Sequence, residues 1–382
     1  NTTWGSLAGS GDIFSSIASP NLQVGFDGTS STFSGRFQRF NNAFNTTLTK
    51  IGSGVLTLDS AQDGDGSYGQ IIVGGGTLKY SGAGKAFVGT SLQTSSFVAN
   101  TNGTLQLDNS GTNVANRLGL NAAGNLYIQG GKFVLGGNAT AATTEALANL
   151  NIQNGGGRIE LTADAAQALT LAVTTLNTGN GHGALVIGGI TGAASAAGVA
   201  NLTFTTINLI GGQGTGANGT TTMGIRHDIL ADASVSGLGT GFLVRDTVSL
   251  LATMTNNNAV ITVPSTAGIL VGASVSAVAG IPGGSFVTAI DSVNNTVTIN
   301  NGAGVAPQTT TDYFGNYFRA LASNELNTTP RGALGDGVGG WFQGQNAGVS
   351  SAVTLGTDTI VNTLTFSGTA SIGSSLPAAF GR

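Results

Sequence analysis

The chain has 382 residues, of which 40% are hydrophobic and only 8% are charged, and its formal net charge is −4. High hydrophobic content with low charge excludes intrinsic disorder, and the 63 glycines leave little room for long helices. Because the 13 Lys and Arg residues are scattered and outnumbered by acidic ones, a nucleic-acid-binding surface is also excluded.

Cysteine is absent from the chain, which excludes disulfides and thiolate metal sites. No stretch approaches the roughly 18 apolar residues that a membrane-spanning helix needs, so no membrane span is expected. The first four residues, Asn1 to Trp4, do not begin a signal peptide and are typical of the interior of a longer precursor.

Short alternating runs separated by glycines are clearest between residues 48 and 80. Leu48–Ile51, Val55–Leu58 and Gly76–Tyr80 each alternate apolar and polar residues, which places one set of side chains in a core. The intervening glycines suit tight corners. Strands and corners that recur about every 20–25 residues are typical of a solenoid. We therefore expect an elongated β-solenoid, a right-handed parallel β-helix, over residues 1–246.

Pairs of apolar residues separated by one position continue this pattern toward residue 205. The pairs expected to point inward are Leu105 and Leu107, Leu126 and Ile128, Phe133 and Leu135, Ile159 and Leu161, Leu185 and Ile187, and Leu202 and Phe204. Thr143–Ala148 has a weak helical pattern, but a strand is favoured there. The alanine-rich stretch 163–174 leaves helix and strand both open.

Residues 247–307 differ from the rest because their alternation is strict. The expected strands include 259–263, 274–276 and 296–299, and Asn294 with Asn295 is expected to form a hairpin turn. We interpret this stretch as a small β-rich insertion looped out of the solenoid. Residues 308–382 are then expected to return to the solenoid, with its strands between 341 and 372 and a short tail.

The alternating segment between residues 48 and 80 resembles a known repeat. The matching residues are Leu48, Thr49, Lys50, Gly52, Gly54, Leu56, Thr57, Leu58, Gly75, Gly76, Thr77 and Leu78. They resemble the autotransporter-associated β-strand repeat, which implies an exported β-helix on the surface of a Gram-negative bacterium and no particular activity. The insertion resembles a small β module of bacterial surface and phage-tail proteins.

The Asp63–Gly66 stretch is a candidate calcium site, because closely spaced carboxylates suit a hard cation. It lacks the distal bidentate Glu of a helix–loop–helix site, and Asp-Gly is a strong turn signal, so a polar corner is favoured. No metal or cofactor is therefore expected.

Catalytic candidates are few. His182 lies in a glycine-rich corner, and His227, between Arg226 and Asp228, is expected in an exposed loop with a local ion pair. A polysaccharide lyase or hydrolase would need grouped carboxylates or basic residues. The acidic residues are instead mostly single and at expected corners, as at Asp108, Asp164 and Asp291. No catalytic residue is assigned.

An aromatic cluster follows the insertion. It comprises Tyr313, Phe314, Tyr317 and Phe318 together with Arg319. It could form a sugar-stacking platform, but a seal at the junction between the insertion and the solenoid is favoured.

These observations favour a non-catalytic extracellular structural protein, a subunit or segment of a bacterial surface fibre. Neither end of the chain shows an amphipathic helix or a charged turn that would cap the solenoid, so self-association end to end through strand edges is expected. The alternative is an adhesin or passenger stalk that binds glycans or other cells through the insertion and long loops. An enzyme acting on polysaccharides is the third and least favoured hypothesis.

Overall fold

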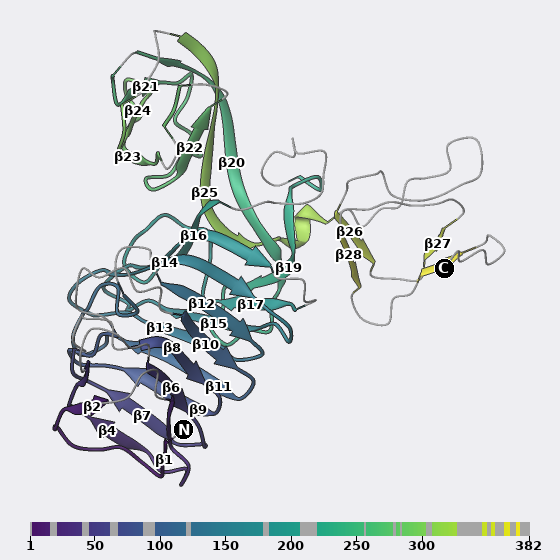
Figure 1. Cartoon of the computed structure of the whole chain (residues 1–382). Coiled ribbons are helices and arrows are strands. Elements are labelled where there is room, and N and C mark those ends of the chain that lie inside the picture. The colour runs from purple at the N-terminus through teal and green to yellow at the C-terminus, as the bar shows by residue number, and fades with distance from the viewer. Residues whose placement is uncertain are drawn as a thin grey trace. The chain divides into compact units, whose positions relative to one another are not determined.

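The computed structural model describes residues 2–15, 21–39, 46–61, 68–86, 96–119, 124–178, 183–206, 220–255, 257–277, 280–282, 285–302, 308–326, 346–349, 353–355, 363–366 and 372–374 (Figure 1). They belong to two compact units, one of Asn1–Ile207 with Asp228–Gly239 and the other of Asn208–His227 with Thr240–Arg382. Within these ranges the regular structure is β-strand, except for the short 3-10 helix η1 (Ser323–Glu325). The all-β expectation is confirmed.

The first unit is a parallel β-solenoid built on a nine-stranded sheet, here called the first sheet. Its strands, in spatial and chain order, are β1 (Thr2–Trp4), β3 (Asn21–Val24), β6 (Thr46–Lys50), β8 (Tyr68–Val73), β10 (Ser96–Asn100), β12 (Asn125–Gln129), β14 (Thr143–Ile152), β16 (Leu169–Thr178) and β18 (Ala200–Thr206). Each strand pairs in parallel with the next, as strands from successive turns of a solenoid must. Each turn of the solenoid is here called a rung. The solenoid prediction is therefore confirmed.

A second sheet follows on the next side of each rung. Its strands in this unit are β4 (Ser31–Phe33), β7 (Val55–Leu58), β9 (Gly76–Tyr80), β11 (Gly103–Asp108), β13 (Lys132–Gly136), β15 (Gly157–Thr162), β17 (Leu185–Gly188) and the part of β19 (Ile225–Asp232) that pairs with β17. These pairs are also parallel, and the arrows stack in one direction in Figure 1.

A third, shorter side completes the rungs. Strand β2 (Ile13–Ser15) pairs with β5 (Phe37–Arg39), and Ala61 bridges to Lys85. In β14 and β16 this side continues directly into the first sheet, so both strands are ten residues long. Strand is therefore the correct assignment at 143–148, and the helical alternative is wrong there and at 169–174.

Apolar side chains stack in register from rung to rung and form the solenoid core. In the first sheet Leu48 aligns with Ile71, Ile71 with Phe97 and Phe97 with Leu126, and all four are fully buried. All twelve residues of the predicted inward pairs are likewise buried, from Leu105 to Phe204. Because each rung is too short to bury its own apolar face, stacking is what removes these side chains from water.

Glycines allow the corners of successive rungs to pack closely. Gly52 has φ +69°, and a Cβ on it would lie 1.9 Å from the carbonyl oxygen of Gly25. Gly25 has φ +106°, and its Cβ would lie 2.2 Å from the carbonyl oxygen of Ile51. Any larger residue would therefore clash with the neighbouring rung at this corner.

The second unit contains an antiparallel sheet with the order β23–β24–β21–β20–β25–β22. These strands are β20 (Gly241–Met254), β21 (Val260–Thr262), β22 (Ser274–Ala277), β23 (Val287–Asp291), β24 (Thr296–Ile299) and β25 (Gln308–Ala320). The residues between 272 and 275 bond back to Ser285 and Val287, with Val275 N donating to Ser285 O at 2.8 Å and Val287 N to Ala273 O at 2.9 Å. The sheet thus closes into a small barrel.

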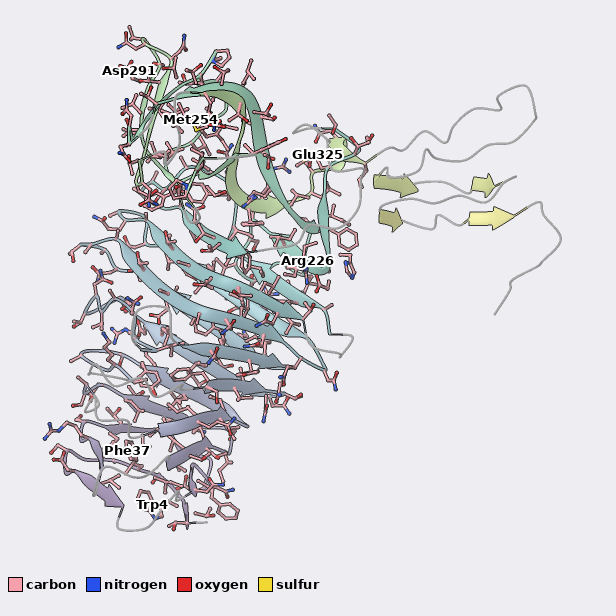
Figure 2. All side chains as sticks on the ribbon, turned by 45° about the horizontal axis from the view of Figure 1, so that its top comes forward. Trp4, Phe37, Arg226, Met254, Asp291 and Glu325 are labelled. Carbon is pink, nitrogen blue, oxygen red and sulfur yellow. The ribbon has the colours of Figure 1, made fainter. Side chains whose placement is uncertain are left out.

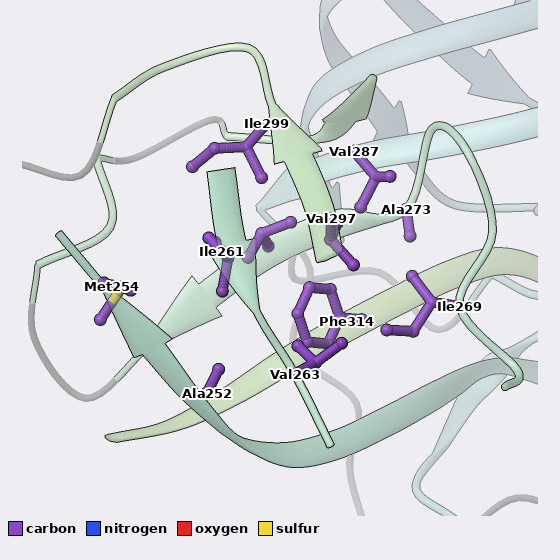
Figure 3. Close-up of a cluster of buried hydrophobic side chains, with 11 residues drawn as sticks. Ala252, Met254, Ile261, Val263, Ile269, Ala273, Val287, Val297, Ile299 and Phe314 are labelled. Atoms are coloured by element: carbon purple, nitrogen blue, oxygen red, sulfur yellow. The ribbon is translucent and has the colours of Figure 1, made fainter. Parts of the chain in front are cut away.

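The barrel has its own hydrophobic core (Figure 3). It contains Ala252, Met254, Ile261, Val263, Ile269, Ala273, Val275, Val287, Val297, Ile299 and Phe314. The strands expected near 260, 275 and 297 are confirmed, and so is the hairpin turn, where Asn295 has φ +51°. The predicted boundary after residue 307 does not mark the end of the barrel, because β25 is one of its strands.

Four short strands lie nearer the C-terminus. Strand β26 (Asn346–Val349) pairs in parallel with β28 (Thr363–Phe366), and β27 (Val353–Leu355) pairs in parallel with β29 (Ile372–Ser374). Parallel pairing at this spacing is the pattern of solenoid rungs. A full return to the solenoid over 308–382 stays a prediction.

Candidate functional site

The structure places the residues that the sequence singled out in separate positions. Asp63–Gly66 and His182 lie outside the described residues. His227 is exposed, as expected, but it lies within strand β19 and not in a loop. Strand β19 continues past His227 and pairs with β17 from Ile229 to Asp232, which places His227 within the strand.

Asp164 lies in a corner, as the sequence predicts, whereas Asp108 and Asp291 are the last residues of strands β11 and β23. Asp164 accepts a hydrogen bond from Ala166 N at 2.9 Å, and Asp291, labelled in Figure 2, accepts one from Asn294 Nδ2 at 2.7 Å. Hydrogen bonds from Asn294 hold the pKa of Asp291 below its ordinary value. The hydrogen bonds of Asp164 and Asp291 stabilise turns.

Asp108 forms a cross-rung ion pair. Its carboxylate lies 2.6 Å from Lys79 Nζ and accepts hydrogen bonds from Ser110. Burial raises the pKa of Asp108, but the bonds from Lys79 and Ser110 outweigh that effect and lower it to about 2. The pair therefore links two rungs of the second sheet.

The aromatic cluster does not form one platform, because β25 alternates its side chains between two faces. Phe314 lies in the barrel core, and Phe318 lies 5.4 Å beneath the Arg245 guanidinium. Tyr317 donates a hydrogen bond to Val271 O at 3.0 Å, whereas Tyr313 is 42% exposed. Only Tyr313 among these rings is available to a large ligand.

Arg319 is part of a compact ionic cluster that the sequence did not suggest. Its Nη2 lies 2.6 Å from Asp246 Oδ1 and 2.6 Å from Glu325 Oε1. The bonds to Glu325 and Asp246 raise the pKa of Arg319 above its ordinary value, against the opposing effect of burial. The cluster ties β20 and β25 to η1, so it supports the fold and leaves the guanidinium occupied.

The described ion pairs of the solenoid rungs between β9 and β15 lie on the second sheet. They join Lys79 to Asp108, Lys132 to Glu160 and Arg158 to Glu160. The charged residues of the nine strands of the first sheet are Lys50 and Glu145, and both are fully buried. The outward positions of the first sheet are therefore free of formal charge in the described strands.

Amide and hydroxyl side chains bond from rung to rung on that uncharged face. Asn149 Nδ2 donates to Asn125 Oδ1 at 2.6 Å, and Asn177 Nδ2 donates to Asn149 Oδ1 at 3.1 Å. At the other end, Thr3 Oγ1 donates to Gln23 Oε1 at 3.2 Å. Such ladders stabilise stacked parallel strands, because every amide can both donate and accept along the stack.

Strand β1 is the last described strand at one end of the first sheet. It pairs with β3 along one edge, and it is the last strand in the described order of that sheet. The Trp4 carbonyl accepts bonds from Gly25 N at 3.1 Å and Phe26 N at 3.2 Å, so the Trp4 backbone faces β3. The Thr3 backbone groups, one residue away, then point to the other edge of the strand.

Among the described residues, no group of three or more His, Asp or Glu side chains could hold a metal ion. None of the helical structure in the same ranges is long and apolar enough to cross a membrane.

Comparison of the chain with protein-family models, with curated proteins and with solved structures found no match. The resemblance to the autotransporter-associated repeat therefore stays a prediction.

Proposed function

We propose that this chain is a non-catalytic structural protein of a bacterial cell surface, a subunit or segment of a fibre. The edge of β1, the last described strand of an in-register parallel stack, carries the proposal. A strand edge of this kind pairs readily with another strand through backbone hydrogen bonds. A second copy that adds its last rung to this edge would continue the stack by the same parallel pairing.

The uncharged first sheet supports the same role. Bringing two rungs together strips water from the groups at their junction, and stripping water from charges is costly. The strands of the first sheet carry Asn, Gln, Ser and Thr outward and keep Lys50 and Glu145 buried. The amide ladder can extend across a junction, since an amide side chain both donates and accepts hydrogen bonds.

Replacing Thr3 by proline should block assembly with little effect on the rest of the fold. Proline removes the N–H that points away from β3, and the backbone of Trp4 keeps its bonds. We expect the parent chain to form fibres at high concentration and Thr3→Pro to reduce their mean length at least about tenfold. Negative-stain electron microscopy and sedimentation would measure both.

Thr3→Val is the matched control, because it keeps the N–H and should assemble like the parent chain. Circular dichroism of the three proteins would check that each is folded. A parent chain that stays strictly monomeric at high concentration would contradict the proposal. Equal assembly of Thr3→Pro and Thr3→Val would show that the β1 edge is not the contact.

A further inference from the structure

The outer surface of the barrel carries a row of threonines across four strands. Thr296 pairs with Thr262, Thr262 with Thr253 and Thr253 with Thr309, which gives a continuous line over β24, β21, β20 and β25. The Thr253 and Thr309 hydroxyls lie 3.0 Å apart. The row is here called the threonine row.

The threonine row faces solvent. Thr253, Thr262 and Thr309 are exposed and Thr296 is half-buried. Their immediate neighbours along the strands, including Ala252, Met254, Ile261 and Val297, point into the barrel core. The alternation therefore divides an apolar inside from a hydroxylated outside.

Two large apolar side chains of β20 and β25 lie on the same surface beside the row. Leu251 is 59% exposed and Tyr313 is 42% exposed. Leu251 is opposite Thr311 and Tyr313 is opposite Ser249, so the two side chains are diagonal neighbours on β20 and β25. Exposed apolar groups gathered in one place mark a binding surface more often than scattered ones do.

The chemistry of this surface indicates what it binds. Hydroxyls that donate and accept, an accessible aromatic ring and an aliphatic side chain are present, and none of these six residues is charged. A neutral sugar matches this set, because its C–H face can stack on a ring while its hydroxyls exchange hydrogen bonds with threonines. We infer that the threonine row, with Leu251 and Tyr313, is a docking surface for a neutral polysaccharide.

Other partners fit this surface less well. Protein interfaces draw their binding energy chiefly from Trp, Tyr and Arg and little from Ser and Thr. Nucleic acid requires positive charge, which these residues lack. The row spans three inter-strand steps, about 14 Å, so it suits an extended chain of sugar residues more than a single small molecule.

The surface is also rigid before binding. Threonine is β-branched and its χ1 is restricted on a strand, so the hydroxyls hold their positions without a large entropy loss on binding. Closure of the barrel fixes the spacing between the strands that carry them. Preorganised groups of this kind favour selective binding over a loose polar contact.

The test is binding of the whole chain to immobilised polymers of glucose, mannose, galactose and N-acetylglucosamine, with a uronic-acid polymer for comparison. We expect binding to at least one neutral polymer that persists at about 0.5 M salt, because no ion pair is involved. Tyr313→Ala should weaken it at least about tenfold, and Thr253→Val, which replaces a hydroxyl by a methyl group, should weaken it several-fold.

Tyr127→Ala, which removes a half-buried tyrosine from the first sheet, is the matched control and should bind like the parent chain. Absence of binding to every neutral polymer would overturn the inference. So would binding that neither barrel variant weakens, or binding only to the uronic-acid polymer. Fibre formation by Tyr313→Ala should equal that of the parent chain, so this test and the test of the β1 edge succeed or fail separately.

Discussion

Arg117→Ala is expected to destabilise the solenoid by about 4–5 kcal/mol, because Arg117 is a fully buried charge that satisfies several backbone carbonyls. Its Nη2 donates to Gly82 O at 3.0 Å, Asp108 O at 3.1 Å and Thr112 O at 2.7 Å. Its Nη1 also donates to the carbonyl of Gly84. These acceptors belong to the end of β11 and to the corners that follow β9 and β11, so one guanidinium joins two rungs.

The loss of stability in Arg117→Ala is large because the carbonyl acceptors stay buried when the guanidinium donor is removed. A buried acceptor left without a partner costs about 1–3 kcal/mol. Arg117 Nε also donates to Asn109 Oδ1 at 2.8 Å, and its backbone N donates to Glu145 Oε2 at 2.7 Å. Burial raises the pKa of Glu145 to about 7, although those backbone bonds and nearby positive charges act in the opposite direction. Removing the guanidinium would weaken this whole network.

Lys132→Ala is the matched control for this prediction. Lys132 Nζ lies 3.1 Å from Glu160 Oε1 with 40% of its side chain exposed, so its loss should cost less than about 1 kcal/mol. Urea unfolding followed by circular dichroism, with hydrogen exchange of peptides from 96–178 to locate the change, would measure both variants. Equal urea midpoints of unfolding for Arg117→Ala and Lys132→Ala would contradict the role assigned to Arg117.

Asp312→Asn is expected to stabilise the barrel above about pH 6 and to remove most of its pH dependence. Asp312 lies in β25 on the same face as Phe314, opposite Leu250, and it is fully buried. Both of its carboxylate oxygens lack a hydrogen-bond partner among the described residues. Burial without a partner raises the pKa of Asp312 to about 6.

The direction of the pH effect follows from which state holds the proton more tightly. The folded barrel keeps Asp312 protonated up to about pH 6, whereas the unfolded chain releases that proton near its ordinary pKa of 3.8. The free energy of unfolding therefore falls as pH rises from about 4 to about 6 and then levels off. A shift of this size corresponds to about 2–3 kcal/mol.

Hydrogen exchange of peptides from 259–302 in increasing urea, at about pH 4.5 and about pH 8 and corrected for intrinsic rates, would measure the stability of the barrel alone. The parent barrel should be weaker at the higher pH, and Asp312→Asn should show little difference. Asp291→Asn, an exposed turn substitution, is the control and should keep the parental pH dependence. A parent barrel that is equally stable at both pH values would contradict the burial of an unpartnered acid.

The sequence alone predicted the strands and their inward faces, because period-two alternation is a local property. Pairs such as Leu105 with Leu107 and Phe133 with Leu135 are buried as predicted. The glycine corners near Gly52 and the hairpin turn at Asn295 were also predictable, since unusual φ angles favour specific residues. The alternating threonines of the barrel could have been found in the same way.

Contacts between residues distant in sequence were decided only by the tertiary structure. Closure of the barrel depends on bonds from Val275 to Ser285 and on the addition of β25, which the strict alternation within 247–307 does not reveal. Arg117 and Asp312 look like surface residues in the sequence, and only the packing of neighbouring rungs and strands buries them. Local alternation specifies which side of a strand faces inward, but the groups that meet there depend on how strands separated in sequence come together.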